Sequence, residues 1–187
     1  MLASWSAVTL DLVPHCSSVP RDAWQDDDGL RPLSDAGTTQ AALLGEVLAP
    51  GADAVYSSPA LRCRQTVAPL AAAAGVPVVP DDRLRESEGF SEPTAWTQGT
   101  FAPIGSALGG AWAAGRAMGV LAEAAGNHHG GRAVVCSHGD VIPALLVHLA
   151  AAHRCALPDI VAHGSWYRLE LADGRLSMTG LGPHSAI

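Results

Sequence analysis

The chain has 187 residues, of which 48% are hydrophobic and 16% are charged, and this composition is typical of a folded globular protein and argues against disorder. The length favours a single domain over residues 1–187. The formal net charge is −7, with 11 basic residues against 18 acidic ones, which argues against a nucleic-acid partner because such proteins need a basic face.

The cysteines and the apolar segments indicate the compartment. The four cysteines are widely spaced and form no CxxC pair, so we expect no disulfide framework and a cytoplasmic location. No basic segment precedes the first apolar run, as a secretory signal would require. The most apolar stretch, 67–79, is interrupted by Pro69, Gly75 and Pro77 and is too short to span a bilayer, so no membrane partner is expected. The oligomeric state stays open.

The chain begins with a predicted strand and a long loop. Residues 7–13 form an apolar run rich in β-forming residues, as expected for a central strand. Residues 14–33 then form a loop, and a loop of this length inside a compact domain is usually functional. Its acidic run at 26–28 is interpreted as solvated, because no glutamate follows at the spacing of a calcium-binding loop.

Strands and helices alternate through the rest of the chain. Ser34 is expected to cap the first helix, Gly75 to end the second, and Asp173-Gly174 to turn a C-terminal hairpin. The predicted segments are helices over 34–49, 59–74, 104–125 and 141–152, strands over 54–57, 76–79, 133–137, 165–171 and 175–179, and a second long loop over 81–100. This alternation predicts an α/β fold, a three-layer α/β/α sandwich with a mostly parallel central sheet and a C-terminal antiparallel hairpin.

Polar side chains stand at the ends of three predicted strands. His15, Ser58 and His138 hold these positions, and ligands of open α/β sheets bind at the carboxyl ends of strands. Arg62 lies in the first turn of the helix after Ser58 and is expected to point back to this edge, whereas Arg64 faces elsewhere. Helix N-termini present free N–H groups that favour an anion. The sequence therefore predicts a phosphate pocket.

Several motifs together resemble the histidine phosphatase superfamily, which has the phosphoglycerate-mutase-like fold. The motifs are Leu12-Val13-Pro14-His15, Arg31-Pro32-Leu33-Ser34, Ser57-Ser58-Pro59-Ala60-Leu61-Arg62 with Gln65-Thr66, Leu84-Arg85-Glu86, and Ser137-His138-Gly139. The resemblance covers nearly the whole chain. Its details are nearest to the short bacterial phosphohistidine-phosphatase branch and to the histidine phosphatase domain that is sometimes fused to Nudix hydrolases.

The resemblance implies a metal-independent phosphatase without a cofactor. His15 would be the nucleophile that forms a phosphohistidine, and His138 would donate a hydrogen bond to the transferring phosphoryl group. Arg62 would hold the phosphoryl oxygens as a bidentate fork. Glu86 would be the general acid, with Glu88 as its rival. The implied partner is a phosphorylated small molecule or a phosphoprotein. The mutase activity of larger family members is disfavoured because the loop over 81–100 is too short to hold the larger substrate-clamping insertion that this activity needs.

One position departs from the family pattern. Pro14 stands where the family has an arginine that clamps the phosphate, and proline supplies neither a guanidinium nor an N–H. Cys16 stands where the family has glycine or alanine. Arg31 or Arg21 would be the substitute, and we expect Arg31 and Ser58 to bind phosphate with Arg62.

The departure leaves two hypotheses open. One is an active phosphohydrolase, and the other is a pseudo-phosphatase that binds a phosphorylated ligand with His15, Arg62 and His138. A cysteine-based phosphatase is not supported, since its loop needs five residues between cysteine and arginine and only 17–20 separate Cys16 from Arg21. The sequence identifies no zinc ligand set and no partner for His163.

Overall fold

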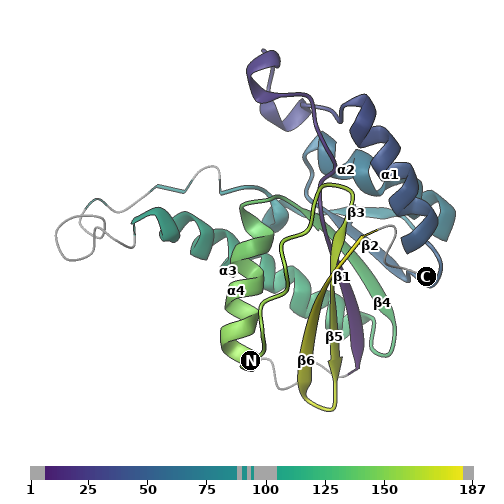
Figure 1. Cartoon of the computed structure of the whole chain (residues 1–187), viewed down its shortest axis with the longest axis vertical. Helices are drawn as coiled ribbons and strands as arrows, with labels where there is room; N and C mark the ends of the chain where they lie inside the picture. Colours follow the sequence, from purple (N-terminus) through teal and green to yellow (C-terminus); the bar gives the residue numbers. More distant parts are fainter. Residues whose placement is uncertain (1–6, 88–89, 92–93, 95–104, 183–187) are drawn as a thin grey trace.

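The computed structural model describes residues 7–87, 90–91, 94 and 105–182, and its centre is a six-stranded sheet with the order β3-β2-β4-β1-β5-β6 (Figure 1). The strands are β1 Val8–Pro14, β2 Ala54–Ser57, β3 Val78–Pro80, β4 Arg132–Ser137, β5 Trp166–Ala172 and β6 Arg175–Leu181. Strands β3, β2, β4 and β1 are parallel, while β5 runs antiparallel to β1 and pairs with β6 as a hairpin.

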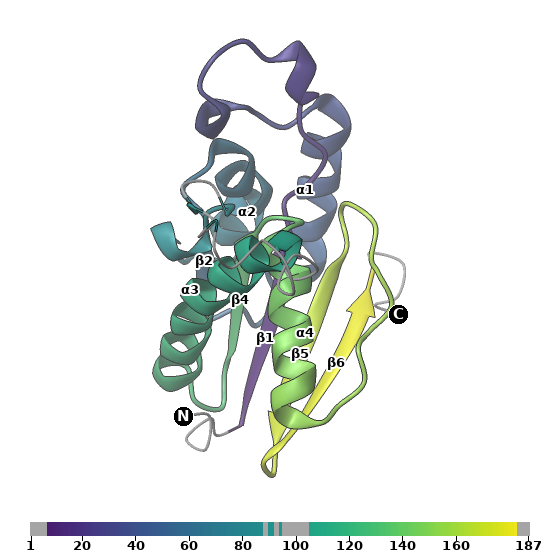
Figure 2. The same ribbon diagram turned by 90° about the vertical axis from the view of Figure 1, so that its left-hand side faces the viewer.

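Four helices cover the two faces of this sheet. They are α1 Asp35–Leu48, α2 Leu61–Ala74, α3 Gly105–Asn127 and α4 Val141–His153. Helices α1 and α2 pack on one face around a core that includes Val13, Val55 and Val134. Helices α3 and α4 pack on the other face with Leu10 and Leu12, and Figure 2 shows both helices in front of the strands. The predicted three-layer sandwich with a mostly parallel sheet is confirmed.

Strand β1 lies inside the sheet and alternates between the two cores. The expected apolar run contains one charged exception, Asp11, whose side chain is fully buried. Its carboxylate accepts hydrogen bonds from Arg132 Nε at 2.8 Å and from Arg168 Nε and Nη2 at 2.8 and 3.0 Å. Arg132 also donates to the carbonyl oxygens of Leu48 and Pro50 at the end of α1. Asp11 therefore joins three strands to a helix end.

The expected helix and turn signals are found at their places. The Ser34 side chain accepts from the Gly37 N–H, and Gly75 ends α2 in the left-handed conformation with φ 71°. Asp173 and Gly174, with φ 51° and 72°, turn the β5–β6 hairpin.

The start of one helix and the structure within two loops differ from the expectation. Helix α2 begins at Leu61, two residues after the predicted start, because the Ser58 N–H still bonds to Cys136 O in the manner of a strand and Ala60 is extended. The loop over 14–33 contains two short 3-10 turns, η1 Arg21–Ala23 and η2 Asp28–Leu30, and a third, η3 Asp82–Leu84, follows β3.

None of the helices in the described part of the chain is long and apolar enough to cross a membrane. All four cysteines are free thiols, and three of them (Cys16, Cys63 and Cys136) are buried.

Candidate active site

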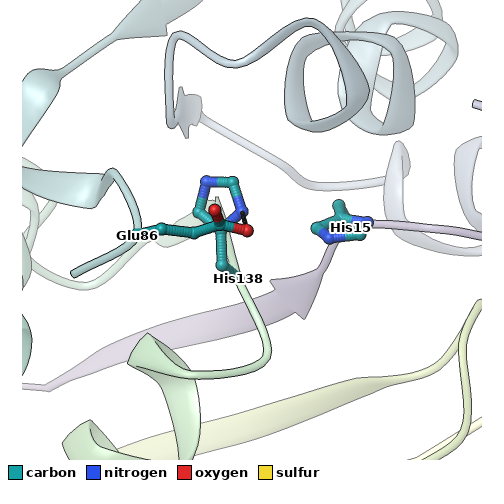
Figure 3. Close-up of side chains that lie close together, drawn as sticks. All are labelled: His15, Glu86 and His138. Carbon is teal, nitrogen blue, oxygen red and sulfur yellow. Dashed lines mark ion pairs between the residues drawn. The ribbon is translucent and has the colours of Figure 1, made fainter. Parts of the chain in front are cut away.

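The candidate site lies at the carboxyl edge of the parallel strands. The pairing of Pro14 with Ser137 and of Ser57 with Cys136 brings the ends of β1, β4 and β2 together. His15 follows β1 and His138 follows β4, and their ring centroids are 5.4 Å apart with an interplanar angle of 72°. Glu86, which follows η3, completes the group (Figure 3). A ring nitrogen of each histidine and a carboxylate oxygen of Glu86 all lie within 4.8 Å of one another.

His15 is presented as a neutral imidazole. Its Nδ1 lies 2.8 Å from the Cys16 carbonyl oxygen, and since a carbonyl only accepts, Nδ1 carries the proton and Nε2 keeps its lone pair. Burial lowers the pKa of His15 below 6.5, and the charges of His138 and Arg62 act in the same direction. The charge of Cys63 and the hydrogen bond to the Cys16 carbonyl raise the pKa but are outweighed. A neutral ring with an available lone pair is the form that attacks phosphorus.

His138, in contrast to His15, is protonated. Burial alone would lower its pKa, but hydrogen bonds to the Cys63 sulfur and to Glu86, together with the charges of both, raise the pKa of His138 to about 9. Its Nδ1 lies 3.1 Å from Glu86 Oε1, and its Nε2 lies 2.8 Å from Ser58 Oγ. His138 is therefore an imidazolium near neutral pH, and Ser58, expected to bind phosphate, contacts this ring.

Arg62 is almost fully buried, with 2% of its surface exposed. Its Nη1 donates to the Asp28 carbonyl oxygen at 2.7 Å, and its Nη2 lies 2.8 Å from Glu86 Oε1 and 3.1 Å from Asp28 Oδ2. Its Nε is buried without a hydrogen-bond partner among the described residues. Arg62 thus points back to the strand ends as expected, and Arg64 is exposed.

Glu86 lies where the cationic groups converge. The hydrogen bond from His138 holds the pKa of Glu86 well below its usual range, and the charge of His138 and the hydrogen bond and charge of Arg62 act in the same direction. Burial of the carboxyl group opposes them but is outweighed. Glu86 is consequently a carboxylate in this arrangement and has no proton to donate. Its expected rival, Glu88, lies outside the described residues.

The two arginines of the loop after β1 have different positions. Arg31 is buried, and its guanidinium contacts Asp28 Oδ1 at 2.8 Å, Ser18 Oγ at 2.7 Å and the Val19 carbonyl oxygen at 2.8 Å. These bonds hold the loop that carries Asp28. Arg21, with 64% of its side chain exposed, lies 3.2 Å from Asp28 Oδ2 and 3.3 Å from Glu86 Oε2. Arg21 is the one of the two that contacts the Glu86 side chain.

His163 is a site neighbour that the sequence did not identify. Its Nδ1 lies 3.0 Å from the His15 carbonyl oxygen, and the two rings are 6.0 Å apart. The segment before β5 reaches His15 because β5 pairs antiparallel with β1, with Tyr167 opposite Leu12. A cavity of about 220 Å³ lies beside it and is lined by Pro14 of β1, Ile142 and Pro143 of α4 and the residues before β5.

The same cluster could be considered as a metal site, because two histidines and a carboxylate are common ligands of divalent metals. The charges of His138 and Arg62 disfavour a metal ion at this cluster. His138 would have to lose its proton to bind a metal, and the buried Arg62 guanidinium, whose Nη2 lies 2.8 Å from Glu86 Oε1, would still repel a divalent cation. The same two groups favour an anion.

Comparisons with known proteins agree with the sequence resemblance. A family model described as the histidine phosphatase superfamily, branch 1, matches residues 21–182, a range that begins after His15. An 8-oxo-(d)GTP phosphatase of Mycolicibacterium smegmatis is 30% identical over 171 residues, which are 90% of this chain and 46% of that protein. The chain therefore spans about half the length of this relative.

Solved structures share the fold. A mycobacterial glucosyl-3-phosphoglycerate phosphatase in complex with VO3 superposes with a TM-score of 0.65 at 22% identity, over 91% of this chain and 96% of that one. The protein histidine phosphatase SixA in complex with tungstate gives a TM-score of 0.60 at 15% identity, over 94% and 97% of the two chains.

Proposed function

Because this chain belongs to the histidine phosphatase superfamily, branch 1, we propose that it is a phosphohydrolase that transfers the phosphoryl group of its substrate to His15 and then to water. The observation that carries the proposal is the pairing of a neutral His15, with its Nε2 lone pair available, with a cationic His138 at 5.4 Å between ring centroids. One group is suited to attack phosphorus, and the other is suited to hold the charged oxygens.

The proposed reaction has two steps. In the first, His15 Nε2 forms a bond to phosphorus as the bond from phosphorus to the leaving oxygen breaks, and the leaving group takes a proton. In the second, water attacks the phosphohistidine, loses a proton and releases inorganic phosphate and His15. Arg62 and His138 would stabilise the equatorial oxygens in both steps, and Ser58, through its 2.8 Å contact with His138 Nε2, supports that ring.

Glu86 is proposed as the proton donor, although it is ionised in the unliganded arrangement. A phosphoryl group that takes the place of Glu86 Oε1 at Arg62 and His138 would break the contacts of 2.8 and 3.1 Å that depress its pKa. It would also put a like charge beside the carboxylate, and both changes raise the pKa of a carboxyl group. Substrate binding would in this way convert Glu86 into an acid.

The proposed substrate is a phosphomonoester or a phosphorylated protein side chain. Two relatives carry the names of phosphatases of small molecules, 8-oxo-(d)GTP and glucosyl-3-phosphoglycerate, and a third is named a protein histidine phosphatase. We propose a cytoplasmic location, which the free thiols of all four cysteines support.

The test compares wild type and His15→Ala on p-nitrophenyl phosphate. We expect His15→Ala to lose at least about 10³-fold in kcat, since a removed nucleophile cannot be replaced by the rest of the site. Arg64→Met, which removes one exposed arginine from the same helix as Arg62, serves as the control and should keep the wild-type rate. Equal rates for wild type and His15→Ala would contradict the proposal.

A second candidate function is a non-catalytic binder of phosphorylated ligands. Pro14 favours it, because the position beside the nucleophile supplies no guanidinium. It predicts that the wild type binds orthovanadate or inorganic phosphate but shows no turnover above that of His15→Ala. Measurable phospho-His15 after mixing with substrate would exclude it.

A further inference from the structure

Two guanidinium groups bracket one anion position at the candidate site. Arg62 Nη2 and Arg21 Nη2 both contact Asp28 Oδ2, at 3.1 Å and 3.2 Å, so that a single oxygen atom separates them. The same two nitrogens contact the two oxygens of Glu86, at 2.8 Å and 3.3 Å. Two arginines and two carboxylates therefore alternate around a small closed ring.

We propose that Arg21 is a substrate-binding residue that supplies, from the loop after β1, the second guanidinium for the phosphoryl group. This inference rests on the proposed function and adds a residue to it. The carboxylates of Asp28 and Glu86 contact both arginines, and phosphoryl oxygens would take the place of these carboxylate oxygens. Glu86 Oε1 in particular touches Arg62 and His138, the two groups expected to hold the phosphoryl group.

The position of this ring relative to His15 supports the proposal. A Glu86 oxygen lies within 4.8 Å of a His15 ring nitrogen, so an anion that replaces the carboxylate would lie within reach of the nucleophile. Arg21 contacts the other oxygen of the same carboxylate. A tetrahedral phosphoryl group has three equatorial oxygens, and Arg21 is placed to meet one that Arg62 and His138 do not.

The other candidates for this task are engaged elsewhere. Arg31 donates to Ser18, Val19 and Asp28 within its own loop. Arg85, next to Glu86 in the chain, pairs with Asp82 at 2.7 Å. His163 bonds to the His15 backbone. Among the ion pairs of the residues that the structure describes, the Glu86 carboxylate is contacted by Arg62, His138 and Arg21 alone.

The two arginines also differ in exposure in a way that suits their proposed tasks. Arg62 is 2% exposed and is held by the Asp28 carbonyl oxygen, so it forms the rigid floor of the anion position. The Arg21 side chain is 64% exposed, and among the described residues it pairs with the carboxylates of Asp28 and Glu86. It can follow the anion as the carboxylates give way, without disturbing a packed core.

The experiment measures binding of inorganic phosphate to the full chain by titration calorimetry, and needs no turnover. We expect Arg21→Met to weaken binding by about tenfold to a hundredfold, as for a lost hydrogen bond between charged groups. Arg21→Lys should bind with intermediate affinity, and Arg64→Met, the control for loss of one exposed positive charge, should bind as wild type does. Equal affinity of Arg21→Met and Arg64→Met would overturn the proposal.

A second pair of variants distinguishes an Arg21 that contacts the bound anion from an Arg21 that only neutralises the charge of Asp28. Asp28→Asn removes the competing charge but keeps a carbonyl oxygen for Arg31, and it should tighten phosphate binding. If Arg21 contacts the anion, Arg21→Met must still weaken binding in the Asp28→Asn background. If the effect disappears there, Arg21 only neutralises Asp28 and the proposal fails. Because the chemistry is tested by the rate of His15→Ala, a failure here is distinguishable from a failure of the proposed function.

Discussion

At the scale of single residues, Pro14 changes the side chain beside His15 but leaves the backbone in place. Pro14 is the last residue of β1 and pairs with Ser137. The N–H of His15 donates to the Ser137 carbonyl oxygen at 2.9 Å, so the strand still delivers the histidine to the edge of the sheet. The loss is confined to a guanidinium and the N–H of residue 14.

Introducing the missing guanidinium distinguishes the two candidate functions. With Arg21 at the anion position, we expect Pro14→Arg to change kcat/KM of an otherwise wild-type chain by less than about tenfold. In the Arg21→Met background the same substitution should recover most of the lost kcat/KM on p-nitrophenyl phosphate. Activity that first arises with Pro14→Arg, from a wild type without turnover, would instead support the non-catalytic binder.

The charge states of the two histidines predict the pH dependence. His15 must be neutral to attack, so kcat/KM should fall with decreasing pH as His15 gains a proton through its lowered pKa, below 6.5. His138 must be charged, so kcat/KM should also fall with increasing pH near its pKa of about 9. The expected profile is a bell whose plateau lies between these limits.

Glu86→Gln provides the check on this assignment. It removes the negative charge that helps to raise the pKa of His138 and leaves a neutral amide oxygen as a weaker acceptor, so the alkaline limb should move to lower pH whatever happens to the maximal rate. An alkaline limb that stays at the same pH in Glu86→Gln would show that a group other than His138 controls it.

At the scale of elements, the buried carboxylate of Asp11 connects β1 with both neighbouring strands. Arg132 of β4 and Arg168 of β5 pair with it at 2.8 Å, and their side chains are 18% and 29% exposed. Removing the carboxylate leaves two arginines without their partner, whereas the partial exposure of both lets water replace some of the interaction. The cost should therefore be lower than for a fully buried pair.

We expect Asp11→Asn to reduce the free energy of unfolding by roughly 2–4 kcal/mol, measured by urea denaturation. The matched control is Glu46→Gln, which removes one negative charge from an exposed position on α1 and should change stability by less than about 0.5 kcal/mol. An Asp11→Asn variant as stable as this control would show that the two arginines are satisfied without the carboxylate.

At the scale of the whole molecule, an anion should stabilise the fold because the site joins segments from distant parts of the chain. Inorganic phosphate at about a hundred times its Kd should raise the Tm by roughly 5–10 °C relative to chloride at equal ionic strength. Arg62→Met should remove most of this increase, whereas His15→Ala should retain it. An equal increase in Arg62→Met would place the bound phosphate elsewhere.

Much of this architecture could be predicted from the sequence because it depends on local signals. The apolar run of β1, the Ser34 cap and the Asp173-Gly174 turn each encode their element within a few residues. Parallel strands with helical connections share one carboxyl edge, so His15, Ser58 and His138 could be expected to meet there. The structure brings them together through the pairing of β1 and β2 with β4.

The remaining contacts depend on the paths of loops and on strand neighbours, which periodicity does not encode. Arg21 meets Glu86 across 65 positions in the sequence because η1 and η3 lie on the same side of the strand ends. His163 meets His15 because β5 is the neighbour of β1, a choice that no local motif specifies. Asp11 could not be interpreted before its partners, which are 121 and 157 residues away, were known.

The directions of the first and last strands have a practical consequence for handling the protein. Strand β1 runs toward the edge that carries His15, so a segment joined ahead of Val8 leaves from the opposite edge of the sheet. Strand β6 ends with Leu181 opposite Trp166, close in sequence to His163, and so ends at the edge that carries the site. An affinity tag or an immobilising linker on the N-terminal side is therefore joined to the end of β1 that lies away from the candidate site.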